Sequence, residues 1–326
     1  MSRRIWVSTM AFQGSGGPTV QDSLDKAARL IDTAALDKPD IIFLPEIFAC
    51  TGVPYDRAEE MAQPVPGPIT DMAAEQAKKH STNIICPLLE RRGDAVYNSA
   101  VVIDREGRIA GIYEKVHPVT TSFDFTVFEL GVRPGQEPKV FELDFGRIGV
   151  LICFDILWAG QWAKLAEMGA EVVFWASAYD GGFHLQALAW DNHYYVVSAV
   201  QSSHAAIMDM TGQVLARTEP PQAVIGMEIN LEKKFFHTDF NGSQIPAIKQ
   251  KYGRDVTIHR YHREGGMTVE SNRPGLTVAN LMEEFDLELL PDYMARHERA
   301  EAFTRAGRKP EPQPPRRVKA EWSTDD

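Results

Sequence analysis

Two spacings of apolar residues alternate along the first 230 residues of the chain. Helical spacing, with apolar residues three or four apart, predicts helices over residues 18–36, 68–79, 159–168 and 183–194. Apolar runs typical of strands lie between and after them, over residues 5–7, 41–44, 83–85, 98–104, 108–115, 139–143, 147–153, 171–175, 195–200, 205–209, 213–216 and 224–229. Some strands are separated by helices and others are joined by tight turns. This mixture predicts an α/β protein with layered, mixed sheets, in which two similar halves can pack sheet on sheet.

The pattern changes beyond about residue 231, where regular alternation fades. Residues 276–290 still predict one helix. Residues 307–319 contain four prolines, with five basic residues against one acidic, a composition typical of a flexible arm. We therefore expect one large domain over residues 1–262 and a C-terminal extension over 263–326, which serves as an oligomer contact or a flexible tail.

The overall composition narrows the class of protein. With 44% hydrophobic and 24% charged residues, the chain of 326 residues is typical of a globular protein. Its formal net charge of −11 argues against nucleic acid or an anionic membrane as the main partner. The three cysteines, Cys50, Cys86 and Cys153, are too few for a disulfide framework or a cysteine-rich zinc site, and they favour a reducing compartment.

The sequence shows no sign of export or of a bound cofactor. The first strand begins almost at once, without the apolar segment and cleavage site of a signal peptide, and no apolar run approaches the roughly 20 residues of a membrane helix. We expect a cytoplasmic protein without a membrane partner. The glycine-rich segment 14–17 lacks the Lys-Ser/Thr of a phosphate loop, and His259 and His262 have no carboxylate at ligand spacing, so we expect neither cofactor nor metal.

Three apolar strands each end on a reactive side chain. Glu46 follows Phe43-Leu44-Pro45, Lys115 follows Ile112-Tyr113-Glu114, and Cys153 follows Val150-Leu151-Ile152. Each of these residues alone is ordinary, since a buried cysteine is most often a small apolar residue. Strand ends are, however, where the sites of layered α/β proteins collect, so the three together predict one site.

These segments resemble the Glu-Lys-Cys site of the nitrilase, or carbon–nitrogen hydrolase, superfamily. Order and spacing agree, with 69 residues from Glu46 to Lys115 and 38 from Lys115 to Cys153. Arg133-Pro134-Gly135 and the predicted hairpin at residues 209–215 are also similar to that family. The resemblance covers about residues 4–230. It implies a four-layer αββα sandwich of two mixed β-sheets flanked by helices.

The resemblance also implies a second glutamate between the lysine and the cysteine. Glu129 is the best match, although it lies about one residue closer to the Pro-Gly than the family pattern suggests. Glu137 is the alternative, and Glu114 is expected to be a structural or exposed neighbour. Asp155 either orients the turn after the nucleophile or caps a helix.

The chemistry of these residues fits the roles that the resemblance implies. A free thiol has a pKa of about 8.5, so it benefits from a base that takes its proton during attack, and Glu46 can supply that base. Lys115 and the backbone N–H of Phe154 can stabilise the charge that develops on the substrate. The acyl group then remains on Cys153 as a thioester until Glu46 activates water. We further expect Trp175 and Tyr179 to line the substrate pocket.

Amide or N-carbamoyl hydrolysis, giving a carboxylic acid and ammonia or an amine, is the favoured activity. Phe154-Asp155 after the nucleophile is closer to amidases than to nitrilases, which usually have Trp-Glu there. A nitrilase stays the alternative, because Lys115-Val116-His117-Pro118 is similar to the Lys-Leu-x-Pro of nitrilases. A non-catalytic metabolite-binding or assembly subunit is the alternative of another class. The family usually pairs through helices beside the nucleophile strand, which implies a homodimer or a higher homo-oligomer.

Overall fold

The computed structural model describes residues 3–14, 16–53 and 60–313. It divides into two compact units, of which the first is Ile5–Ile229. The second begins at Asn230 and includes the N-terminal residues up to Arg4. The sequence-based boundary between residues 262 and 263 lies inside the second unit, in a turn between two paired strands. The division into a hydrolase domain and an extension with a role in assembly stays a prediction.

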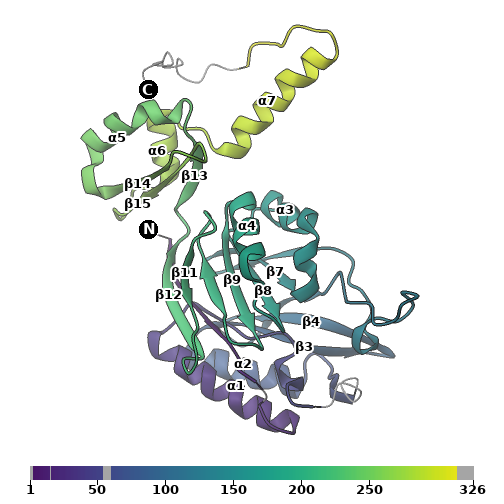
Figure 1. Cartoon of the computed structure of the whole chain (residues 1–326). Helices are drawn as coiled ribbons and strands as arrows, with labels where there is room; N and C mark the ends of the chain where they lie inside the picture. The colour runs from purple at the N-terminus through teal and green to yellow at the C-terminus, as the bar shows by residue number, and fades with distance from the viewer. Residues whose placement is uncertain (1–2, 15, 54–59, 314–326) are drawn as a thin grey trace. The chain divides into compact units, whose positions relative to one another are not determined.

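The first unit contains two six-stranded mixed sheets (Figure 1). One has the order β12-β1-β2-β3-β4-β5 and the other β11-β10-β9-β8-β7-β6. In each sheet, three neighbouring strands are parallel, β1-β2-β3 and β7-β8-β9, and the strands beyond β3 and on both sides of β7-β8-β9 pair antiparallel. Their bounds are β1 Arg4–Met10, β2 Ile41–Phe43, β3 Asn83–Arg92, β4 Ala95–Ile103, β5 Ile109–Glu114, β6 Lys139–Leu143, β7 Gly146–Ile152, β8 Val172–Ser177, β9 Tyr195–Val200, β10 Ala206–Met208, β11 Val214–Arg217 and β12 Val224–Asn230.

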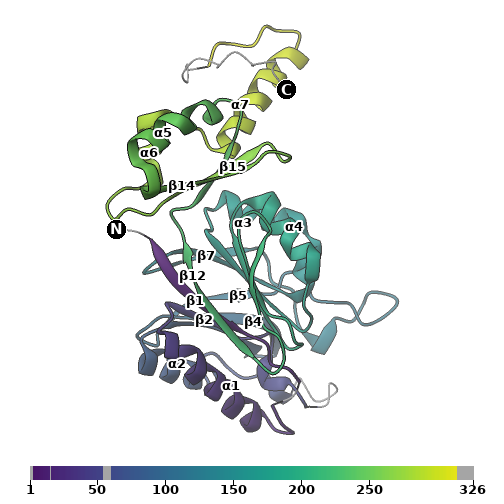
Figure 2. The same ribbon diagram turned by 60° about the vertical axis from the view of Figure 1, so that its left-hand side comes forward.

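Helices cover the outer face of each sheet (Figure 2). α1 (Val20–Ala34) and α2 (Pro68–His80) pack on the first sheet, and α3 (Ala159–Glu167) and α4 (Gly182–Asn192) lie on the second. The inner faces meet through apolar side chains, such as the rings of Phe43 and Phe174, whose centroids are 5.3 Å apart. This arrangement confirms the predicted four-layer αββα sandwich.

Strand β3 is longer than the sequence predicts. The expected strand 83–85 continues to Arg92, through Pro87. A proline cannot donate to a sheet ladder, which normally argues against a central strand. Here β2 pairs with β3 only as far as Ile85, and the N–H of Leu44 donates to the Ile85 carbonyl at 3.1 Å. Pro87 lies two residues after Ile85, so its nitrogen faces the same edge of β3, where β2 has already ended.

The second unit has regular structure that the sequence pattern did not predict. A three-stranded sheet has the order β13-β15-β14, with β13 Lys234–His237, β14 Val256–Tyr261 and β15 Gly266–Ser271. α5 (Ile245–Tyr252) and α6 (Val278–Phe285) share one apolar core with this sheet, and α7 (Leu290–Arg305) follows. The helix expected over residues 276–290 is the shorter α6, which ends at Phe285, and α7, which begins at Leu290, was not predicted. Residues 314–326, which include positions 314–319 of the predicted flexible arm, lie outside the described residues.

Over the described ranges, the structure has no helix that is long and apolar enough to span a bilayer.

Candidate active site

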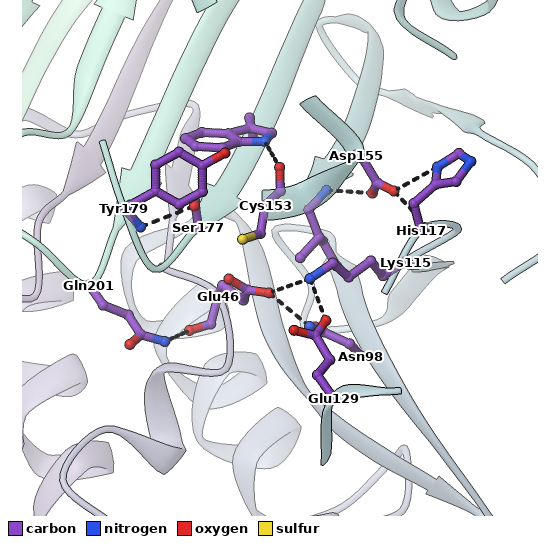
Figure 3. Close-up of polar contacts among 12 residues, drawn as sticks. Glu46, Asn98, Lys115, His117, Glu129, Cys153, Asp155, Ser177, Tyr179 and Gln201 are labelled. Carbon is purple, nitrogen blue, oxygen red and sulfur yellow. Dashed lines mark hydrogen bonds and ion pairs between the residues drawn. The ribbon is translucent and has the colours of Figure 1, made fainter. Parts of the chain in front are cut away.

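Glu46, Lys115 and Cys153 converge on one place in the first unit (Figure 3). Glu46 follows β2, Lys115 comes directly after β5, and Cys153 comes directly after β7. Only 4% of Glu46 and 1% of Lys115 is exposed. The structure thus brings together the strand-end side chains that the sequence analysis selected.

The Lys115 ammonium lies between two carboxylates. Its Nζ donates to Oε1 of Glu46 at 3.1 Å and to Oε1 of Glu129 at 2.6 Å. The Nδ2 of Asn98 also donates to Glu46 Oε1, at 2.8 Å. Two carboxylates around one ammonium leave a net negative charge in a buried site, which is costly for folding and is typical of a functional centre. With two donors on Oε1, Oε2 is the Glu46 oxygen available for proton transfer.

Cys153 lies on a sharp turn between strand and helix. Its φ of 46° is in the left-handed region, which costs a non-glycine residue about 1–2 kcal/mol. The indole N–H of Trp175 donates to the Cys153 carbonyl at 2.9 Å and helps to hold the turn. A short 3-10 helix, η5 (Cys153–Leu157), begins here. The turn directs the thiol toward the Glu46 carboxylate (Figure 3).

Burial and charge set the protonation states of Cys153 and Lys115. Burial, reinforced by the negative charge of Glu46, raises the pKa of Cys153 to about 12, although Lys115 and hydrogen bonds from Ser177 and Ala178 oppose the shift. Burial alone would lower the pKa of Lys115, but the negative charges around it prevail and hold that pKa well above its usual value. The resting site therefore contains a neutral thiol beside a protonated lysine.

Of the glutamates near Lys115, the structure brings only Glu46 and Glu129 to its ammonium among the described residues. Burial raises the pKa of Glu129 despite the opposing charge of Lys115. Glu114 instead forms ion pairs with Arg92 at 3.1 Å and Lys139 at 2.6 Å. Glu137, the alternative second glutamate, is exposed. The geometry thus favours Glu129, whose role in the reaction is taken up as a proposal below.

The predicted substrate-binding residues surround the cysteine in different ways. Tyr179 is 44% exposed, and burial together with the negative charge of Glu46 raises its pKa. Its ring lies 5.4 Å from the ring of Trp175, which is fully buried. The ring of Phe154 contacts Trp158 edge-on, with the centroids 5.1 Å apart. Contact of these residues with substrate stays a prediction, and Trp175 offers it no exposed surface in this structure.

Sequence reasoning missed several polar residues that support the site. Asn98 interrupts the apolar pattern of β4. A single amide side chain in a strand is too common a feature to indicate a site. Gln201 directly follows β9 and donates to the Glu46 carbonyl at 2.7 Å, so the strand-end argument used for Glu46 applies equally to it. Ser177 is the last residue of β8. Within the described part of the chain, no group of three or more His, Cys, Asp or Glu residues could hold a metal ion.

Fold and site define an αββα-sandwich protein with a buried Glu-Lys-Cys centre. The sequence profile of the carbon–nitrogen hydrolase family matches residues 11–233, most of the chain. The chain therefore belongs to the carbon–nitrogen hydrolase family, within the nitrilase superfamily. The match confirms the predicted superfamily and the predicted class of enzyme, a hydrolase of carbon–nitrogen bonds.

Individual relatives agree with this assignment. The chain is 27% identical over 254 residues to the zebrafish (Danio rerio) omega-amidase NIT2, covering 71% of this chain and 89% of that protein. It is 29% identical over 250 residues to a deaminated glutathione amidase of Synechocystis, covering 68% and 91%. Among solved structures, a mutant amidase from Nesterenkonia sp. AN1 superposes with a TM-score of 0.60 at 17% identity, covering 70% and 91%. That protein carries the acetamide moiety of fluoroacetamide covalently added at its active-site cysteine.

Proposed function

We propose that this chain hydrolyses an amide or N-carbamoyl bond of a small molecule, through a thioester on Cys153. The observation that carries the proposal is the Lys115 ammonium, bound to Glu46 and Glu129 beside a cysteine on a strained turn. The amidase names of the curated relatives, and the covalent adduct on the cysteine of the Nesterenkonia amidase, support it. No observation in the site favours a nitrile over an amide.

The first half of the reaction forms the thioester. Because the thiol is neutral at rest, Oε2 of Glu46 takes its proton as Sγ attacks the carbonyl carbon. Negative charge develops on the carbonyl oxygen, where the Lys115 ammonium and the N–H of Phe154 stabilise it; loss of one such donor costs about 3 kcal/mol in other enzymes. Glu46 then returns the proton to the nitrogen, the C–N bond breaks, and ammonia or an amine leaves.

The second half releases the acid. Glu46, a carboxylate again, removes a proton from water as the water oxygen attacks the thioester carbon. The C–S bond breaks, the proton passes to Sγ, and a carboxylic acid leaves the restored thiol. Glu129 holds the Lys115 ammonium in place through both halves and helps to move protons at the site.

A substrate panel tests this proposal. Ammonia release is measured from amides, N-carbamoyl amino acids and nitriles, with Cys153→Ala as the inactive variant and Cys86→Ala as a matched control at a buried cysteine that the reaction does not use. We expect turnover of at least one amide or carbamoyl compound, lost only in Cys153→Ala. Turnover of nitriles alone would contradict amide hydrolysis. Full activity in Cys153→Ala would remove Cys153 from the mechanism, and a thiol at Cys153 no more reactive to iodoacetamide than Cys50 or Cys86 would favour the non-catalytic alternative.

We also propose that the protein is a cytoplasmic homodimer or higher homo-oligomer in which the C-terminal segment contacts a second copy. None of the 16 residues of α7 is buried, and an isolated helix of this length is marginal in water. Residues 290–319 contain eight basic and four acidic residues, in a chain with a net charge of −11, so they complement the surface of another copy. Removing residues 307–326 should reduce the number of copies in the assembly, measured from its mass in solution. An unchanged number of copies would contradict this contact.

A further inference from the structure

Asp155 is a fully buried carboxylate, two residues after the nucleophile, that the reaction above leaves without a role. Its Oδ2 accepts hydrogen bonds from the N–H of Ile152 at 2.9 Å and from the hydroxyl of Tyr113 at 2.7 Å. Its Oδ1 accepts from the N–H of His117 at 2.9 Å, and the ring Nδ1 of His117 lies 3.3 Å away. Both oxygens are therefore occupied by groups from two separate parts of the chain (Figure 3).

The partners of this carboxylate flank the two reactive groups. Ile152 directly precedes Cys153, whereas Tyr113 and His117 lie two residues before and two residues after Lys115. Because β5 and β7 belong to different sheets, the hydrogen bonds of Asp155 join the turn of the nucleophile in one sheet to the end of the lysine strand in the other.

We propose that Asp155 is a positioning residue that fixes the Lys115 ammonium relative to the Cys153 thiol. This role deepens the proposed function and rests on it. The productive alignment of a nucleophile with its electrostatic stabiliser is sensitive to displacement, and a shift of about 1 Å can cost about 100-fold in rate. Through this single carboxylate, the turn at Cys153 and the end of β5 are held in one position relative to each other.

Helix capping does not account for these contacts. A cap of η5 needs only the bond between the carboxylate and the N–H of Ile152, which spans three residues. The bonds from Tyr113 and His117 span 42 and 38 residues and contribute nothing to that helix. A carboxylate buried at a cost in free energy, and satisfied mainly by remote donors, is explained by the connection it makes.

A second layer of contacts holds His117 in place. Its ring stacks on Trp158, with the centroids 3.7 Å apart and 8° between the planes, and its Nδ1 lies 3.0 Å from Nε2 of Gln161. The indole N–H of Trp162 donates to the Asp155 carbonyl at 3.2 Å. Gln161 and Trp162 belong to α3, and Trp158 lies between η5 and α3. The segment that follows the nucleophile therefore also holds His117, on the lysine side of the connection.

The first test replaces the carboxylate by an amide of the same shape. Asp155→Asn puts an amino group where backbone and hydroxyl donors point, so we expect kcat to fall about 100-fold with KM within about threefold of wild type. Asp144→Asn is the matched control, because Asp144 accepts bonds from Arg105 and Asn83 away from the site, and its kcat should not change. Wild-type kcat in Asp155→Asn would overturn the proposal.

A second variant keeps the test decisive if Asp155→Asn does not fold. Tyr113→Phe removes one donor on the lysine side and leaves the carboxylate, so we expect a fall in kcat of about tenfold at unchanged KM. In the Asp155→Asn background the same change should have no further effect, since Asp155→Asn already disrupts the hydrogen bond that Tyr113→Phe removes. Wild-type kcat in Tyr113→Phe, or additive losses in the double variant, would overturn the proposal.

A crystal structure of Tyr113→Phe gives a readout that does not depend on activity. We expect the end of β5 to move relative to the turn at Cys153, compared with the wild-type crystal structure. Unchanged positions of both would overturn the positioning role, whatever the activity of the enzyme. Inactivity of the wild type on every compound would instead contradict the proposed function.

Discussion

Each unit of the molecule buries a glutamate in an ion pair, yet only one of the two pairs belongs to the proposed active site. In the first unit, Glu46 meets Lys115, which lies 69 residues further along the chain and is 1% exposed. In the second unit, Glu288 meets Arg296, eight residues further along, at 2.9 and 3.2 Å. The side chain of Arg296 is 27% exposed.

The difference between these pairs shows which kind of buried charge indicates function. Arg296 matches one carboxylate with a planar, partly solvated cation, an arrangement that serves stability. Lys115 is fully buried and shared by Glu46 and Glu129, and the negative charges around it keep it protonated. Burial, with the charge of Glu46, raises the pKa of the nearby Cys153. Convergence of distant, imperfectly balanced charges on a nucleophile distinguishes the site; burial alone does not.

The largest effect is expected from removing the lysine of the first pair. Lys115→Ala deletes the cation that stabilises the developing charge, so kcat should fall about 10³-fold. Steady-state ammonia release measures this loss, with circular dichroism to verify the fold. A rate within tenfold of wild type would place Lys115 outside the mechanism.

A smaller effect, on stability instead of rate, is expected from the second pair. Glu288→Gln leaves Arg296 without its carboxylate and should lower the free energy of unfolding by about 2 kcal/mol, less than the 3–5 kcal/mol typical of fully buried pairs because Arg296 is partly exposed. Urea denaturation measures this change. A loss of kcat in folded Glu288→Gln would contradict the separation of the two roles.

The smallest effect concerns the pH dependence of the thiol. The negative charge of Glu46 contributes to the raised pKa of Cys153, about 12, so iodoacetamide labelling of wild type should keep accelerating up to at least pH 10. Glu46→Gln removes that charge, lowers the pKa of the thiol and makes labelling at pH 8 faster while turnover is lost.

Slower labelling of Glu46→Gln would show that the carboxylate promotes thiolate formation at rest and would contradict this account. Cys153→Ala, labelled in parallel, gives the contribution of Cys50 and Cys86.

Local pattern was sufficient to predict most helices and strands of the first unit and to select three strand-end residues, whereas the four-layer arrangement was implied by the family resemblance. β6 and β9 occur with the predicted bounds, because continuous apolar runs between turn residues are strong signals. Glu46, Lys115 and Cys153 were found because each interrupts such a run at its end. The extension of β3 through Pro87 was missed, because a proline is tolerated in this strand only where the neighbouring strand has ended.

The rest of the molecule depends on contacts that local pattern does not encode. β14 exposes polar residues such as His259 and Arg260 on a small sheet, so its apolar signal is short and irregular. Asn98 and Asp155 acquire their roles only through partners distant in sequence, 52 residues away for Asn98 and up to 42 for Asp155. A single Asn in a strand or a single Asp after one does not by itself indicate such partners.

Detection of the acyl group on Cys153 tests the central claim most directly. Wild type is mixed with an accepted amide, quenched in acid during turnover and digested for mass spectrometry. The account predicts a mass increase equal to the acyl group on the peptide that contains Cys153, removable by hydroxylamine and absent from Cys153→Ala. Turnover without any adduct on Cys153, or an adduct on another residue, would contradict it.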